Sequence, residues 1–173
     1  MPMPFYDAVV PTYLQILRGT VAWLAKAEAE TVQLGIAESE AMDARLAPDM
    51  YPFNRQVRAT AMHSQGAIEG ARKGLFSPDM TSPPASFGGL RDRLGEAVSY
   101  LEALDPGEFD LLIGQPMRFV IGDTDLPFMA DQFLLSFSMP NFFFHTSTAY
   151  AILRSKGVNL GKRDFLAGLR FER

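Results

Sequence analysis

The sequence predicts an all-α fold, a four-helix bundle with a short β-hairpin or extended insertion before the last helix. Four stretches of roughly 20 residues carry apolar side chains at spacings of three and four, the period of an amphipathic helix. The connections between them contain clustered proline and glycine, which end helices. The length of 173 residues suits one domain. We therefore expect residues 1–173 to form a single domain with a C-terminal tail over 158–173.

The first predicted helix covers residues 9–30. Apolar residues recur there at helical spacing from Val9 to Leu24. Pro11 fits a first helical turn, where the missing N–H of proline is tolerated. A short helical turn over 38–46 follows this helix.

The second long helix is predicted over residues 52–74. Gly74 stands where a left-handed glycine is favoured at the C-terminal end of a helix. Three prolines make residues 77–86 a loop, because proline fixes φ and lacks a backbone donor. The third helix is predicted over 86–104, and the Asp-Pro-Gly sequence at 105–107 ends it.

A hairpin is predicted over residues 115–128, since apolar runs flank a Gly-Asp-Thr-Asp turn at 122–125. The last helix is predicted to begin near 126–130 and to end at Gly157, with a kink at Pro140. Together the four helices indicate an up-and-down or crossover bundle. The charges of the tail offset one another, so we expect the tail to be solvated.

Composition and charge exclude several classes of protein. With 16 Lys and Arg against 20 Asp and Glu, the net charge is −4, and no broad cationic field exists for nucleic acid. The absence of cysteine excludes disulfide scaffolds, thiolate metal sites and thiol nucleophiles. The start lacks the charged region of a signal peptide, and the most apolar window, 133–144, is too short to cross a membrane. We expect a cytoplasmic protein with no nucleic-acid or membrane partner.

The two histidines, His63 and His145, are the first candidates for chemistry. At 100° per residue, His145 points directly away from the wet side of the last helix, and Ser138, Asn141 and Thr148 lie on its side. Buried polar groups need partners, or they cost about 1–3 kcal/mol each. His63 falls at the border between the apolar and charged faces of the second helix. Very small neighbours leave space beside it for a close backbone or a ligand.

Asn141 and His145 are four residues apart, the spacing by which one helix supplies two ligands to a metal ion. His63 is the only other imidazole, so these three residues form the predicted His/Asn/His site. Two neutral imidazoles and an amide leave a divalent charge uncompensated, and we expect weak affinity. Structural roles compete with this interpretation. Each histidine can be a hydrogen-bonded core residue, and Asn141 can satisfy a carbonyl freed at Pro140.

The stretch PNFFFHTSTAYAILRSKG at 140–157, with RLAPDMYP upstream at 45–52, resembles a bacterial, domain-of-unknown-function branch of the DinB/YfiT-like metalloenzyme superfamily. Similarity to that branch covers nearly the whole chain. In the superfamily, the last helix carries a His-x-x-x-His pair ahead of a Leu-Arg-x-x-Gly ending. His145 matches the second histidine, Asn141 stands in place of the first, and His63 matches a histidine of helix two. The resemblance implies a DinB-like four-helix bundle, commonly dimeric, whose metal-bearing relatives include thiol-dependent transferases.

Two functions stay open from the sequence. The first is a metal-dependent hydrolase or thiol transferase in which zinc or nickel binds the His/Asn/His site. The second is a non-catalytic dimeric protein that binds a small molecule or another protein and has lost the metal. A second apolar row on the last helix, formed by Phe133, Phe137 and Phe144, exceeds what a monomeric bundle helix needs. It predicts a homodimer built on that row.

Overall fold

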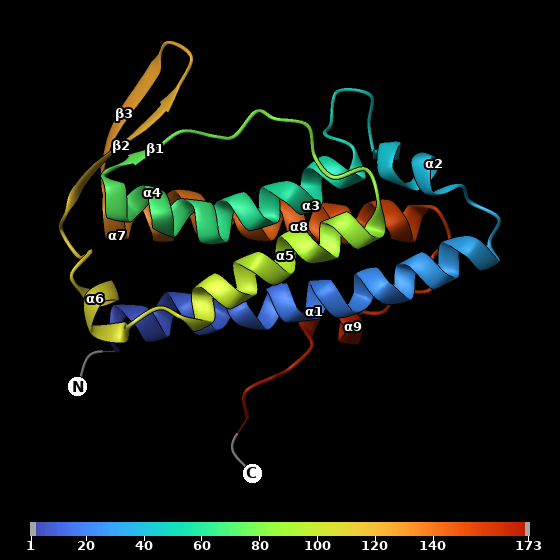
Figure 1. Cartoon of the computed structure of the whole chain (residues 1–173), viewed down its shortest axis with the longest axis horizontal. Coiled ribbons are helices and arrows are strands. Elements are labelled where there is room, and N and C mark those ends of the chain that lie inside the picture. Colours follow the sequence, from blue (N-terminus) through green and yellow to red (C-terminus); the bar gives the residue numbers. More distant parts are fainter. Residues whose placement is uncertain (1–2, 172–173) are drawn as a thin grey trace.

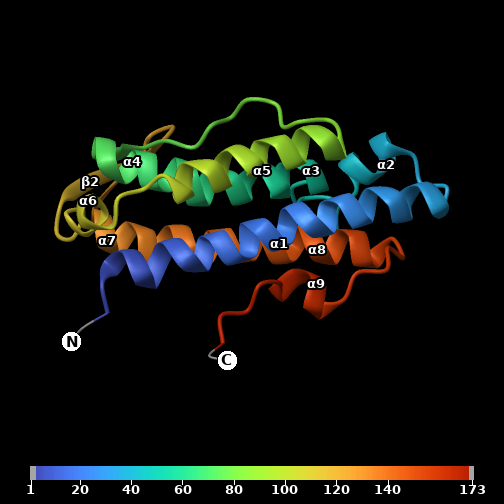
Figure 2. The same ribbon diagram turned by 60° about the horizontal axis from the view of Figure 1, so that its bottom comes forward.

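The computed structural model describes residues 3–171. Four long helical segments lie alongside one another and enclose an apolar core (Figures 1 and 2). They are α1 (Phe5–Gln33); α3 (Phe53–Ala61), continued by the π-helical η1 (Met62–Gly66) and by α4 (Ala67–Lys73); α5 (Phe87–Glu102); and α7 (Ala130–Gln132), continued by the π-helical η2 (Phe133–Ser138) and by α8 (Met139–Ser155). Helix α3 packs on α8, and α1 packs on α5. Within the described residues, no helix is both long and apolar enough to cross a membrane.

Three short helices flank these segments. They are α2 (Glu38–Asp43), α6 (Pro106–Asp110) and α9 (Lys162–Leu166). The predicted helix ends at Ser86 and Gly74 are confirmed, since Ser86 Oγ accepts a hydrogen bond from Gly89 N at 3.1 Å and Gly74 has φ of 72°. The sequence Asp105-Pro106-Gly107, predicted to end the third long helix, also begins the short helix α6. Asp105 Oδ1 accepts from Glu108 N at 2.9 Å and thereby caps α6.

A three-stranded sheet lies at one end of the helices (Figure 1). Its strands are β1 (Leu75–Phe76), β2 (Pro116–Ile121) and β3 (Thr124–Met129). The antiparallel pair β2–β3 lies in the region predicted as a hairpin, while β1 pairs parallel with β2 and corrects the all-α prediction. Gly70 permits this arrangement, because a Cβ there would lie 2.8 Å from Cβ of Phe76. The chain therefore turns back close against α4.

Helix α1 begins earlier than predicted, so Pro11 lies inside it and not in its first turn. The ring of Phe109 in α6 packs against Phe5 and Tyr6, with centroid distances of 5.0 and 5.8 Å. In addition, Asp110 Oδ1 accepts a hydrogen bond from Tyr6 N at 2.9 Å. Helix α6 thus packs on the extra first turn of α1 and accepts a hydrogen bond from one of its free N–H groups. These contacts stabilise the turn although Pro11 follows it and lacks a backbone N–H.

The segment after Gly157 is only partly a solvated tail, since the cations Lys162, Arg163 and Arg170 stay exposed while its first residues are packed. Val158 and Leu160 are buried, and α9 packs on α1 (Figure 2). Tyr150 Oη donates to the Leu160 carbonyl at 3.2 Å, which ties the segment to α8. Burial of Val158 and Leu160 favours this position, and the nearby Lys162 and Arg163 stay exposed to solvent. Residues 172 and 173 of the predicted tail lie outside the described residues.

The apolar row on the last helix is mostly covered by the chain itself. Phe133 is fully buried, with ring centroids of Phe76 and Phe128 at 5.2 and 5.6 Å. Phe137 packs against the same core. Of the row, only Phe144 stays exposed, at 55%. The prediction of a homodimer interface built on all three side chains is therefore wrong, because the three-stranded sheet covers Phe133 and Phe137.

Candidate functional site

The two histidines meet between the second and fourth long helical segments. His63 lies on η1 and His145 on α8, and their ring centroids are 5.5 Å apart with 13° between the ring planes. Both are buried, with exposed fractions of 4% and 9%. The burial predicted for His145 is confirmed, but the border position predicted for His63 is wrong. Its ring is covered by Phe76 and Phe137, at 5.8 and 5.9 Å.

One pocket of about 180 Å³ is lined by all three predicted residues, His63, Asn141 and His145. We name it the histidine pocket. Tyr51, which precedes α3, also lines it, and its ring lies nearly parallel to that of His145 at 6.3 Å. Another wall comes from residues 77–86, the segment between β1 and α5 that we call the strap. The structure therefore brings together residues from two helices and places a loop over them.

Gln56 determines which nitrogen of His145 carries the proton. His145 Nδ1 lies 2.6 Å from Gln56 Oε1. The amide orientation of Gln56 is set by a second contact, in which its Nε2 donates to the Tyr51 carbonyl at 3.1 Å. Because an amide oxygen only accepts, Nδ1 of His145 must donate. Its Nε2 is left with a free lone pair.

Ser138 likewise determines which nitrogen of His63 carries the proton. Ser138 Oγ donates to the main-chain carbonyl of His63 at 3.0 Å, which uses the hydroxyl proton. The same Oγ lies 3.4 Å from His63 Nδ1. With its proton already committed, the hydroxyl can only accept from Nδ1, so Nε2 of His63 also keeps a free lone pair.

Burial keeps both imidazoles neutral. Loss of solvation, with a smaller contribution from neighbouring His145, lowers the pKa of His63 to about 3. Loss of solvation lowers the pKa of His145 to about 4. Both values lie below the ordinary histidine pKa of about 6.5, so at pH 7 both rings are uncharged. A neutral imidazole with a free Nε2 can act as a base or as a metal ligand.

Asn141 is partly committed to the main chain. Its Nδ2 donates to the Phe137 carbonyl at 2.7 Å, in agreement with a role in satisfying a carbonyl near Pro140. This contact leaves Oδ1 of Asn141 available. Among residues 3–171, no group of three or more His, Cys, Asp or Glu side chains is arranged to hold a metal ion. An ion in the histidine pocket would therefore depend on two imidazoles and an amide oxygen.

The sequence pattern did not reveal the residues that orient the imidazoles. Gln56 acts across the helix interface on His145, and Ser138 acts on His63, although only a polar row including Ser138 was recognised. It also missed the two π-helical segments, η1 and η2, which carry His63 and Ser138 respectively. Such segments are rare and occur often at functional sites. The local signal was Gln56 itself, the one long polar side chain among the very small neighbours of His63 on its helix.

Replacing Gln56 with leucine should lower the free energy of unfolding by about 1–3 kcal/mol, because the buried N–H of His145 loses its acceptor. Urea unfolding measures this change, and ¹⁵N shifts of the imidazole should report a mixed tautomer. Gln132→Leu removes an exposed amide and should change stability by less than about 0.5 kcal/mol. Equal stability of the two variants would contradict the proposed role of Gln56.

Comparisons with known proteins agree with this fold. The family described as "Domain of unknown function (DUF1993)" matches residues 5–166. The crystal structure of a DinB family member protein from Shewanella denitrificans is similar with a TM-score of 0.80 and 24% sequence identity, over 97% of this chain and 94% of that chain. A comparison with curated proteins finds no match. The chain therefore belongs to the DUF1993 family, a branch with the DinB-like fold.

Proposed function

We propose that the histidine pocket binds a divalent metal ion, zinc or nickel, and that the protein is a metal-dependent hydrolase or thiol transferase with a degenerate His/Asn/His site. One observation carries the proposal. Nε2 of His63 and Nε2 of His145 both keep free lone pairs in one pocket, while each Nδ1 is held by a partner. Metal-binding histidines commonly have this arrangement, in which the second nitrogen donates to a fixed acceptor.

The donor set suits a borderline metal. Imidazole nitrogens bind zinc and nickel well, and Oδ1 of Asn141 is a third donor on the helix of His145. An ion bound there supplies a Lewis acid that lowers the pKa of a water or thiol. Because no ligand in this set is charged, the binding should be weaker than at sites with three histidines or a carboxylate.

Titration of untagged protein with Zn²⁺ and with Ni²⁺, followed by calorimetry and metal analysis, tests the proposal. We expect one ion per chain, an affinity at least about tenfold weaker in His145→Ala, and an affinity at least about tenfold tighter in Asn141→His. Phe144→Ala changes the exposed neighbour of His145 and serves as the control. Absence of stoichiometric metal, with no difference between His145→Ala and the control, would exclude the metal site.

A non-catalytic protein that binds a small molecule is the second candidate. The absence of a carboxylate from the donor set favours it, since a bound divalent charge would stay uncompensated. In that case zinc and nickel should leave the melting temperature unchanged, because only a ligand of the folded state raises it. The homodimer and the cytoplasmic location stay predictions, and Phe144 is the one residue of the apolar row exposed enough to serve an interface.

A further inference from the structure

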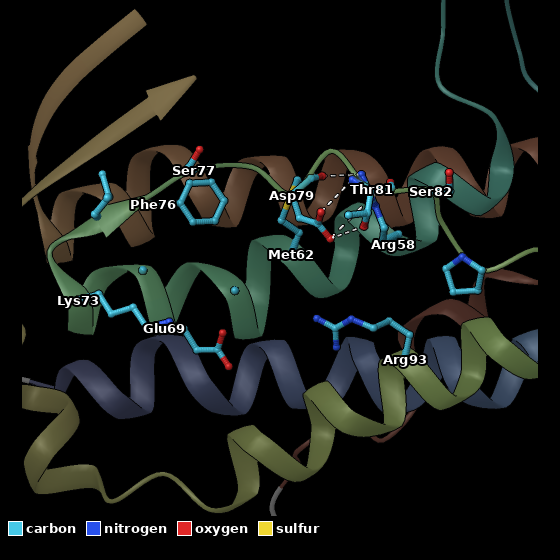
Figure 3. Close-up of a pocket in the computed structure, with 14 residues that line it drawn as sticks. Arg58, Met62, Glu69, Lys73, Phe76, Ser77, Asp79, Thr81, Ser82 and Arg93 are labelled. Carbon is cyan, nitrogen blue, oxygen red and sulfur yellow. Dashed lines mark hydrogen bonds and ion pairs between the residues drawn. The ribbon is translucent and has the colours of Figure 1, made fainter. Parts of the chain in front are cut away.

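A second cavity, of about 410 Å³, is drawn in Figure 3. It adjoins the histidine pocket. The strap forms one side of it, and the segment η1–α4 together with α5 forms the other. Arg58, Met62 and Asp79 line both cavities and so belong to the wall between them. The residues that line only the larger cavity are mostly polar or charged. We call it the strap cavity.

Arg58 is a buried cation whose charge is poorly neutralised. It is 9% exposed, and its guanidinium donates to the main-chain carbonyls of Asp79, at 2.7 Å, and of Thr81. Its ion-pair partner, Asp79 Oδ2, is 3.8 Å away on a side chain that is 58% exposed. Nε of Arg58 is buried and has no hydrogen-bond partner. A buried positive charge with an unpaired N–H donor favours the binding of an anion nearby.

Two further cations line the strap cavity, Lys73 from α4 and Arg93 from α5 (Figure 3). Gln65 positions Arg93, because its Oε1 accepts from Arg93 Nη1 at 2.8 Å while its Nε2 donates to Glu69 Oε1 at 2.8 Å. The ion pair of Arg93 with Glu96 is long, at 3.6 Å, and Glu96 is 70% exposed. Solvent screening makes such a pair weak, so most of the positive charge of Arg93 stays available.

Neutral groups leave room for a ligand and add hydrogen-bonding capacity. Ser77 and Ser82, two neutral polar residues of the strap, are among those that line the strap cavity. On the opposite side, Gly66 has no side chain, and an added Cβ would meet nothing closer than 3.8 Å. The charged residues that line the cavity are three cations, Arg58, Lys73 and Arg93, and two carboxylates, Glu69 and Asp79. The cavity lining therefore has a net positive charge.

We propose that the strap cavity binds a small molecule that carries a carboxylate or phosphate group. Arg93 and Lys73 contact the anion, and Arg58 adds positive charge from the shared wall. The planar fork of arginine matches the paired oxygens of both anion types, and lysine adds a compact charge. Nothing in this site requires the metal, so the inference goes beyond the proposed function and can hold without it.

Isothermal titration of metal-free, untagged protein at low salt tests the site. The probes are succinate, inorganic phosphate and, as the uncharged analogue, succinamide. We expect at least one of the two anions to bind and succinamide not to bind. Comparison of succinate with phosphate identifies the anion type. The double variant Lys73→Gln/Arg93→Gln should bind that anion at least about tenfold more weakly, since it removes the charge-assisted hydrogen bonds to the anion.

Two controls separate the possible causes of a change. Arg91→Gln removes a cation from the same helix that does not line the strap cavity, and it should bind as the unmodified protein does. The absence of metal from the titration is the second control, because the result then does not depend on the metal proposal. The inference is overturned if neither anion binds, if succinamide binds as well as succinate, or if the double variant retains the original affinity.

Discussion

Replacing Phe133 with alanine should lower the free energy of unfolding by about 3–5 kcal/mol. Phe133 is fully buried, and the ring centroids of Phe76, Phe137 and Phe128 lie 5.2, 5.4 and 5.6 Å from its own. These neighbours belong to β1, η2 and β3, so the alanine variant leaves a cavity at the point where the sheet joins the helices. Urea unfolding at several protein concentrations measures the change.

Phe144→Ala is the matched control for this prediction. Phe144 is on the same helical segment but is 55% exposed, so its removal should alter stability by less than about 0.5 kcal/mol. If Phe133 served a dimer interface, the unfolding transition of the unmodified protein would depend on protein concentration, and removal of Phe133 would weaken that dependence. That outcome, with unchanged monomer stability, would contradict the intramolecular packing.

The long helices were predictable because their signals are local. Helical spacing, the cap at Ser86 and the left-handed glycine at Gly74 act within a few residues of each helix end. Strand β1 has only two residues and pairs with β2, where Phe76 lies opposite Phe119. A pairing so distant in the chain leaves no periodic pattern. For the same reason the apolar row on the last helix was assigned to a dimer interface, since periodicity shows that Phe133 needs an apolar partner but not that the partner is a strand of the same chain.

The candidate site was predictable only in part, for the same reason. A helical wheel of constant 100° correctly placed His145 on the dry face. It failed for His63, because Phe76 after α4 and Phe137 on another helix cover that ring. The π-helical segments add a further error, since their wider turns shift the angular position of every later residue on the wheel. Gln56 could be seen as polar, yet its partner across the interface could not.

Lowering the pH from 7 to 4 should destabilise the metal-free protein by about 3 kcal/mol for each histidine. In the folded state the pKa is about 3 for His63 and about 4 for His145, whereas an unfolded histidine has a pKa of about 6.5. Between these values the unfolded chain binds more protons, so stability rises with pH. The stabilisation is complete above pH 6.5 and is lost as the pH falls toward 4 and then 3.

Urea unfolding at pH 7, 5 and 4 measures this loss, and the double variant His63→Gln/His145→Gln is its control. Carboxylates titrate in both proteins, so the difference between their pH profiles isolates the histidines. The variant should start less stable at pH 7 and lose less stability on acidification. Equal slopes would mean that the imidazoles are hydrated and protonate freely in the folded chain. That outcome would contradict the burial of the two rings, but imidazoles of ordinary pKa are still mostly neutral at pH 7, so the metal titration would remain the test of the metal proposal.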